Sequence, residues 1–127
     1  MGSSEPLFMQ IANDLERQIL SGALPEDTQV PSTNELASFH RINPATAAKG
    51  VSLLADRGIL YRKRGLGVFV SAGARKKLVA ERRRTFKDRF VKPMLREAMS
   101  LDLDVEDVLG IIREESPHPN PDVPVTA

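Results

Sequence analysis

Residues 29–70 read QVPSTNELASFHRINPATAAKGVSLLADRGILYRKRGLGVFV, and this stretch decides the fold. Ser32 followed three residues later by Glu35 forms the pattern of a capping box, which predicts a short helix starting after Ser32. Asn43 followed by Pro44 predicts a second helix, because asparagine caps helix starts and proline suits the first helical position. Roughly four residues separate the two helices, which is the spacing of a helix-turn-helix.

A β-hairpin is expected directly after the second helix. Residues 59–62 and 68–70 are rich in strand-forming side chains, and the glycines within residues 64–67 favour a turn between them. A helix-turn-helix followed by such a hairpin is a winged helix. Residues 28–30 should pair with the edge of the hairpin, and an amphipathic helix over residues 6–21 should cover the back of the helix-turn-helix.

Three ordered motifs in this region resemble the DNA-binding domain of the GntR family of transcriptional regulators. They are VPSxxELA beginning at Val30, INPxTxxK beginning at Ile42 and RGxGxFV beginning at Arg64. The resemblance covers residues 6–71. It implies a recognition helix that enters the major groove of DNA and a wing that contacts the minor groove.

The residues expected to contact DNA lie at the two helix starts, on the exposed face of the second helix and at the wing. Small side chains on that face let the helix backbone approach the bases in a major groove about 12 Å wide. Lys49 can reach a guanine edge or a phosphate. The full set is Ser32, Thr33, Asn34, Asn43, Pro44, Ala45, Thr46, Ala48, Lys49, Arg62, Arg64, Gly65, Leu66 and Gly67.

Three residues depart from the GntR pattern. Asn34 stands where the pattern usually has arginine, which removes a strong phosphate contact. His40 stands where an apolar residue is usual, and Arg41 where glycine is frequent. His40 has two interpretations: a pH or ligand sensor, or a half-buried histidine with a backbone partner. We favour the second.

The net charge of +1 conceals an uneven distribution of charge. Residues 59–98 carry thirteen lysines and arginines against three acidic residues, whereas residues 1–58 carry four against seven. Residues 99–127 carry one against seven. A basic block of this density indicates a polyanionic partner. For the residues after 75, a solvated helix face is the alternative interpretation.

The composition also narrows the classes of site. The sequence contains no cysteine, which excludes disulfides, thiol catalysis and thiolate metal sites. It has no apolar run of about 18 residues and no apolar core of a signal peptide, so we expect a cytoplasmic protein without a membrane segment.

Two more helices should follow the wing. Residues 75–98 form a basic helical segment that Pro93 should kink, and Asp104 with Asp107 should start the next helix. These helices cannot form a core alone. Packing back on the winged helix is one option, but we favour self-association into a homodimer that reads a pseudo-palindromic operator in double-stranded DNA. The expected dimerisation residues are Phe86, Phe90, Met94, Leu95, Val105, Val108, Leu109 and Ile112. This layout resembles the YtrA-like branch of the GntR family, which ends in a short two-helix dimerisation region.

The expected fold is mainly α with a small β-hairpin, in the α+β class. Its parts are a winged helix-turn-helix domain at residues 1–71, a two-helix dimerisation region at residues 72–115 and a disordered tail at residues 116–127.

The leading functional hypothesis is a homodimeric, sequence-specific DNA-binding transcription regulator, acting as a repressor. The resemblance implies a small-molecule effector, for which a pocket between the C-terminal helices and the winged helix is the natural place. The alternative is a winged-helix module that binds an acidic protein partner. An enzyme is the least favoured hypothesis, because the sequence lacks paired histidines, a phosphate-binding loop and a defined carboxylate pair. No metal or cofactor is expected.

Overall fold

The computed structural model describes residues 5–117. These residues form two compact units, and the division along the chain falls between Arg84 and Thr85. The tail expected from residue 116 onward lies outside the described residues, apart from Ser116 and Pro117. The expected fold class is confirmed: the chain is mostly helical, with one two-stranded antiparallel hairpin in the part that the structure describes.

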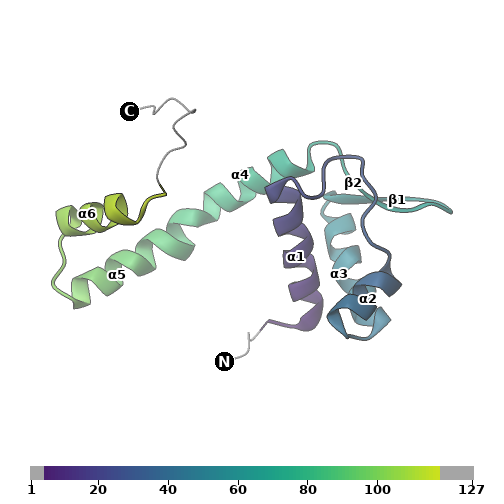
Figure 1. The fold of residues 1–127 in the computed structure, drawn as a ribbon, viewed down its shortest axis with the longest axis horizontal. Helices are drawn as coiled ribbons and strands as arrows, with labels where there is room; N and C mark the ends of the chain where they lie inside the picture. The colour runs from purple at the N-terminus through teal and green to yellow at the C-terminus, as the bar shows by residue number, and fades with distance from the viewer. Residues whose placement is uncertain (1–4, 118–127) are drawn as a thin grey trace. The chain divides into compact units, whose positions relative to one another are not determined.

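The first unit is a winged helix. Its helices are α1 (Leu7–Ser21), α2 (Thr33–His40) and α3 (Pro44–Asp56), and its strands are β1 (Leu60–Lys63) and β2 (Gly67–Val70) (Figure 1). The helix α4 (Ala74–Phe86) follows the hairpin. Helices α1 and α2 both pack against α3, and the hairpin extends to one side of these three helices (Figure 1).

Helices α1 and α3 approach each other closely at Gly50. A Cβ atom at this position would lie 2.7 Å from the carbonyl oxygen of Phe8 and 2.9 Å from the Cβ of Ile11. Such distances leave no room for a side chain, so glycine is required at this contact. The periodicity of the sequence predicts that Ala47, Gly50, Val51 and Leu54 share the inner face of this helix. This prediction is confirmed, because all four residues are buried.

The hairpin has a third, short partner. Leu60 pairs with Val70 across the two strands, and Gln29 forms an isolated antiparallel bridge with Phe69 on the outer side of β2. The Val30 amide donates to the Val68 carbonyl at 2.9 Å. The expected pairing of residues 28–30 with the hairpin edge is therefore confirmed.

Part of α4 belongs to the winged helix. Ala74 and Leu78 are fully buried in the same hydrophobic core as α1, α3 and the hairpin. The first compact unit therefore extends beyond the hairpin into α4. The assignment of residues 72–115 to dimerisation stays a prediction.

In the second unit a π-helical turn, η1 (Lys87–Val91), leads into α5 (Lys92–Ser100) and then α6 (Val105–Glu115). The expected irregularity near Pro93 is present, but it precedes the proline, which occupies the first turn of α5. Proline has no amide hydrogen to donate, so an altered hydrogen-bond pattern just before it costs little. None of the helices formed by residues 5–117 is both long and apolar enough to span a membrane.

Candidate nucleic-acid interface

The start of α2 is fixed by a reciprocal cap. The Ser32 Oγ accepts a hydrogen bond from the Glu35 amide at 3.0 Å, and the Ser32 amide donates to the Glu35 carboxylate at 3.2 Å. The predicted capping box is therefore confirmed. The neighbouring Asn34 is exposed, and Thr33 is half-buried. These polar groups and the unpaired amides of the first helical turn can donate to phosphate oxygens.

The start of α3 is built in a similar way. The Asn43 Oδ1 accepts from the Ala45 amide at 2.8 Å, and Pro44 occupies the first turn. Ala45 is exposed, while Thr46 and Ala48 are half-buried. The side chains that α3 presents next to its capped start are therefore short, as entry into a major groove requires.

Lys49 is not free in the structure. Its ammonium group lies over the ring of Phe8 on α1, 4.1 Å from the ring centroid. Such a cation–π contact at an exposed site contributes about 0.5–1 kcal/mol. Lys49 must leave Phe8 if it is to reach a guanine edge. The sequence analysis missed this contact, because no sequence signal pairs a residue of α1 with one of α3.

The wing is attached to α3 through Arg62. The Arg62 Nη2 donates to the Ser52 Oγ on α3 at 2.9 Å, so one basic side chain of β1 is held beside the exposed face of the helix. Ser52 was not among the expected contact residues. Its position on the outer face, one turn after Lys49, was the available signal.

The tip of the wing combines basic and flexible residues. Arg64 lies in the turn just after β1, so strand alternation does not determine its direction. Gly65 has φ = 78° and Gly67 has φ = 128°, conformations that glycine adopts without strain. Leu66 between them is 64% exposed. Lys63 is directed elsewhere, because its ammonium group lies 4.6 Å from the centroid of the Phe69 ring.

The turn between α2 and α3 contains Arg41, one of the three departures from the GntR pattern. Arg41 adopts the left-handed conformation, with φ = 55° and ψ = 50°. This conformation favours glycine and strains other residues, at a cost of order 1 kcal/mol. It is therefore understandable that glycine is frequent at this position among GntR proteins.

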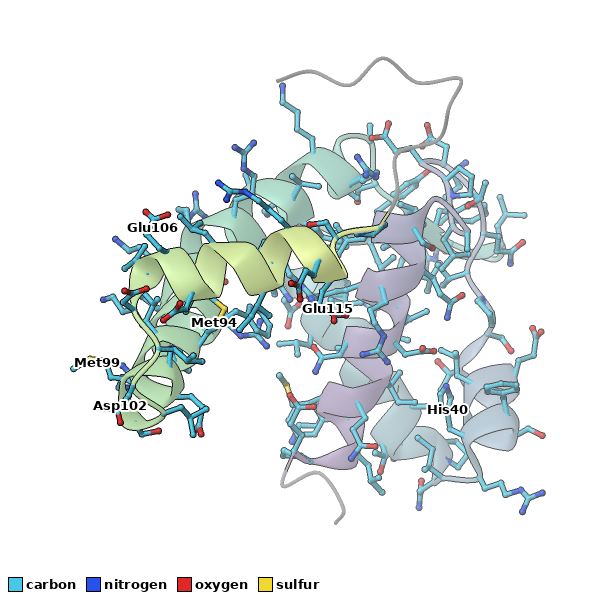
Figure 2. The ribbon with its side chains drawn as sticks, turned by 60° about the vertical axis from the view of Figure 1, so that its left-hand side comes forward. His40, Met94, Met99, Asp102, Glu106 and Glu115 are labelled. Carbon is cyan, nitrogen blue, oxygen red and sulfur yellow. The ribbon has the colours of Figure 1, made fainter. Side chains whose placement is uncertain are left out.

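His40 lies at the end of α2 (Figure 2) and has a side-chain partner on α1. Its Nε2 lies 3.6 Å from the Asp14 Oδ2 on α1, and its ring meets Phe39 edge-on, with centroids 5.0 Å apart. The expectation of a half-buried ring is confirmed. The expected partner was wrong, because the group next to the ring is a carboxylate of α1 rather than a backbone group.

Part of the basic segment after the wing is used inside the first unit. The Arg75 Nε donates to the Leu20 carbonyl at 3.0 Å, and Lys77 donates to the Arg57 carbonyl at the end of α3. The Arg82 Nη2 donates to Glu16 at 2.8 Å. The charge density that indicated a polyanionic partner therefore has a partly structural explanation.

Glu16 and Arg57 form the centre of this ion-pair network. Glu16 is 5% exposed, and its second carboxylate oxygen accepts from Arg57 Nη1 at 2.5 Å, while Arg57 Nη2 donates to Glu81 at 2.6 Å. Burial acts to lower the pKa of Arg57, but hydrogen bonding and ion pairing with Glu16 and Glu81 outweigh it and leave the pKa raised. The network thus joins α1, the end of α3 and α4 through ion pairs.

The expected dimerisation residues divide into two groups in the second unit. Val108 is buried and Leu109 is half-buried, so they also pack within the unit. The other members remain exposed: Phe86, Phe90, Met94, Leu95, Val105 and Ile112. Met94 lies between α5 and α6 (Figure 2), where it lines an almost entirely apolar hollow of about 240 Å³.

Among residues 5–117, no group of three or more histidine, aspartate or glutamate side chains is arranged to hold a metal ion. The site is instead a protein surface made of capped helix starts, a small-faced helix and a basic hairpin. Such a surface can bind a nucleic-acid backbone and approach base edges.

The chain is similar to known transcription regulators. It is 29% identical over 114 residues to the HTH-type transcriptional repressor YtrA of Bacillus subtilis (strain 168), and the aligned residues cover 90% of this chain and 87% of YtrA. A GntR family transcriptional regulator from Listeria monocytogenes has the same fold, with a TM-score of 0.72 and 20% identity over 91% of this chain and 100% of that one.

A third comparison includes DNA. The solved complex of AraR(DBD) with operator ORR3 superimposes with a TM-score of 0.51 and 29% identity, over 56% of this chain and 88% of that one. The model of the gntR family of bacterial regulatory proteins matches residues 7–70. The matched residues contain α1, the helix-turn-helix and the hairpin, so the chain belongs to the GntR family.

Proposed function

We propose that this protein is a cytoplasmic, homodimeric, sequence-specific DNA-binding transcription regulator that acts as a repressor. Recognition helix α3 would enter the major groove and the wing would enter the adjacent minor groove. The observation that carries the proposal is the combination of the capped start of α3, its short side chains and the wing that Arg62 holds beside it. We expect no catalytic activity.

Two comparisons support this proposal. YtrA is named a transcriptional repressor and resembles this chain over most of its length. The DNA-binding domain of AraR, which shares the winged-helix region, has been solved with an operator. We further propose that a small-molecule effector releases the protein from DNA, and this part rests on family resemblance alone.

Homodimerisation rests on a separate observation. The described part of the second unit leaves large apolar side chains such as Phe90, Val105 and Ile112 exposed. A second copy could cover them, and two recognition helices related by a two-fold axis would read a pseudo-palindromic operator.

The test is fluorescence anisotropy with labelled DNA duplexes at two salt concentrations. One duplex comes from the region upstream of the protein's own gene, and the control duplex has an unrelated sequence. We expect selective binding that weakens as salt rises, because each neutralised phosphate steepens the log–log salt dependence by roughly one unit. The double variant Lys49→Ala, Arg64→Ala should lose most of this affinity.

Three outcomes separate the alternatives. Equal, weak binding to both duplexes would mean non-specific binding or an operator located elsewhere. A preferred duplex would then be selected from a random-sequence pool, and the test would be repeated with it. Affinity that does not fall when salt rises severalfold contradicts the mechanism. If a folded dimer binds no duplex at either salt, a winged-helix module that contacts an acidic protein becomes the better interpretation.

A further inference from the structure

Gln29 lies in the segment before α2 and is not itself among the expected DNA contacts, yet it touches the wing in two ways. Its side-chain Nε2 donates a hydrogen bond to the Leu66 carbonyl at the wing tip, with a length of 2.8 Å. Its backbone forms the antiparallel bridge with Phe69 on β2. A residue far away in the sequence therefore holds both the stem and the tip of the hairpin.

Gly67 provides the space for this contact. A Cβ atom at Gly67 would lie 2.5 Å from the Gln29 Nε2, a separation from a neighbouring side chain that real Cβ atoms do not adopt. The φ angle of 128° at Gly67 also favours glycine. The second glycine of the wing thus permits the turn and at the same time leaves room for the Gln29 amide.

The wing tip has little other support. Arg64, Gly65 and Leu66 are exposed, and within the turn the Leu66 amide donates to the Lys63 carbonyl at 3.0 Å. Two-stranded hairpins are marginally stable on their own in water. A mobile tip would lose conformational entropy when it enters a groove, and that loss would weaken binding.

We infer that Gln29 is a positioning residue for DNA recognition, which holds the wing tip in its DNA-contacting conformation through the hydrogen bond to Leu66. The inference rests on the proposed DNA-binding function. Gln29 acts on the wing and not on DNA, so its contribution depends on the contacts that the wing tip makes. The chemistry requires a donor, because the group facing the side chain is a carbonyl oxygen.

The experiment uses the full chain and a duplex that the wild-type protein selects from a random-sequence pool. Gln29→Ala removes the donor, and Gln29→Glu keeps the shape but places a carboxylate against the Leu66 carbonyl. Each variant should bind the duplex about threefold to tenfold more weakly, the range that corresponds to one neutral hydrogen bond. Gln10→Ala, an exposed glutamine on α1, is the matched control and should bind like the wild type.

Two further readouts distinguish positioning from a general loss of structure. Amide hydrogen exchange at residues 64–67 should become faster in Gln29→Ala, while exchange within α3 should stay unchanged. In a double-mutant cycle with Arg64→Ala, the loss caused by Gln29→Ala should shrink, because the contact that it supports is already gone.

The outcomes distinguish a failure of the role of Gln29 from a failure of the proposed DNA-binding function of the wing. If Arg64→Ala and both Gln29 variants all bind like the wild type, the wing does not contact DNA and the proposed wing function fails. If Arg64→Ala weakens binding but both Gln29 variants do not, the inference alone is overturned. Fully additive losses from Gln29→Ala and Arg64→Ala would also overturn it.

Discussion

Between residues 5 and 84, large apolar side chains such as Leu15, Ile59 and Val70 are almost completely enclosed, and they belong to one core. Between residues 85 and 117, by contrast, Ala98 and Val108 are the buried apolar residues, and nine large apolar side chains are exposed. Those nine are Phe86, Phe90, Met94, Leu95, Met99, Leu101, Val105, Ile111 and Ile112. The first unit therefore has a closed core, whereas the second leaves an apolar surface that a second copy would cover in the proposed dimer.

The largest effect should come from damage to the closed core. Leu54 on α3 is 0% exposed, and Leu54→Ala should lower the free energy of unfolding by about 2–5 kcal/mol, because a cavity replaces the lost contacts. Urea denaturation followed by circular dichroism measures this change. Leu7→Ala, at the exposed start of α1, is the control and should change stability by less than about 0.5 kcal/mol. Equal effects of the two substitutions would mean that this core is not the main source of stability.

The open surface of the second unit should matter for assembly. Ile112→Lys places a charge on the apolar side of α6, and we expect it to convert the proposed dimer into a monomer. Operator affinity should then fall by about 100-fold or more, because the two half-sites are no longer bound together. Light scattering after gel filtration gives the mass, and anisotropy gives the affinity.

The matched control for assembly is Glu114→Lys, on the opposite side of the same helix. It introduces the same side chain with a larger change in charge, and lysine near a helix end is well tolerated. It should remain dimeric. A monomeric wild-type protein, or a dimeric Ile112→Lys variant, would show that this surface does not mediate assembly.

The ion-pair network that links α1 to α4 should contribute an intermediate amount to the free energy of unfolding. Glu16→Gln removes the charge that pairs with Arg57 and Arg82, and it should lower the free energy of unfolding by about 1–3 kcal/mol. Both arginines are about one-third exposed, so solvent should keep the loss near the lower end. Asp56→Asn, an exposed carboxylate on α3, is the control for urea denaturation and should have little effect.

The pH dependence of this connection follows from Arg57. Its pKa is raised in the folded chain, so its stabilising contribution is complete below the pKa of the unfolded chain and disappears only as pH rises through the still higher folded value. Stability from Arg57 should therefore be constant from about pH 6 to pH 9. The measurement is the difference in free energy of unfolding between the wild type and Arg57→Gln. If this difference varied strongly between about pH 6 and pH 9, another titrating group would have to be coupled to the network.

The smallest predicted effect is a gain. Asn34→Arg restores the side chain that the GntR pattern usually has at the start of α2. One added phosphate contact should strengthen DNA binding severalfold and steepen the salt dependence by about one unit of log–log slope. Asn13→Arg on α1 adds the same charge away from the interface and should leave the slope nearly unchanged. An unchanged slope in Asn34→Arg would mean that this turn of α2 does not face phosphate.

Local signals in the sequence were sufficient for most of the fold. Each capping box involves residues only three positions apart, so Ser32 with Glu35 and Asp104 with Asp107 could be identified without knowledge of the rest of the chain. The periodicity of α3 correctly separated its buried face from its exposed face. The expected DNA and dimer contacts stay predictions, because their partners are other molecules.

Contacts between residues far apart in the sequence were decided only by the tertiary structure. Lys49 rests on Phe8, Glu16 joins Arg57 and Arg82, and Gln29 holds the tip of the wing. In each case the partners lie on different elements of the fold. From the sequence, Lys49 was expected to contact DNA, and no side-chain role was predicted for Glu16 or Gln29. The sequence by itself determined where helices and turns begin and end, because caps and periodicity act over one or two turns. The packing of those elements decided which charged side chains are engaged within the protein and which remain exposed for a partner.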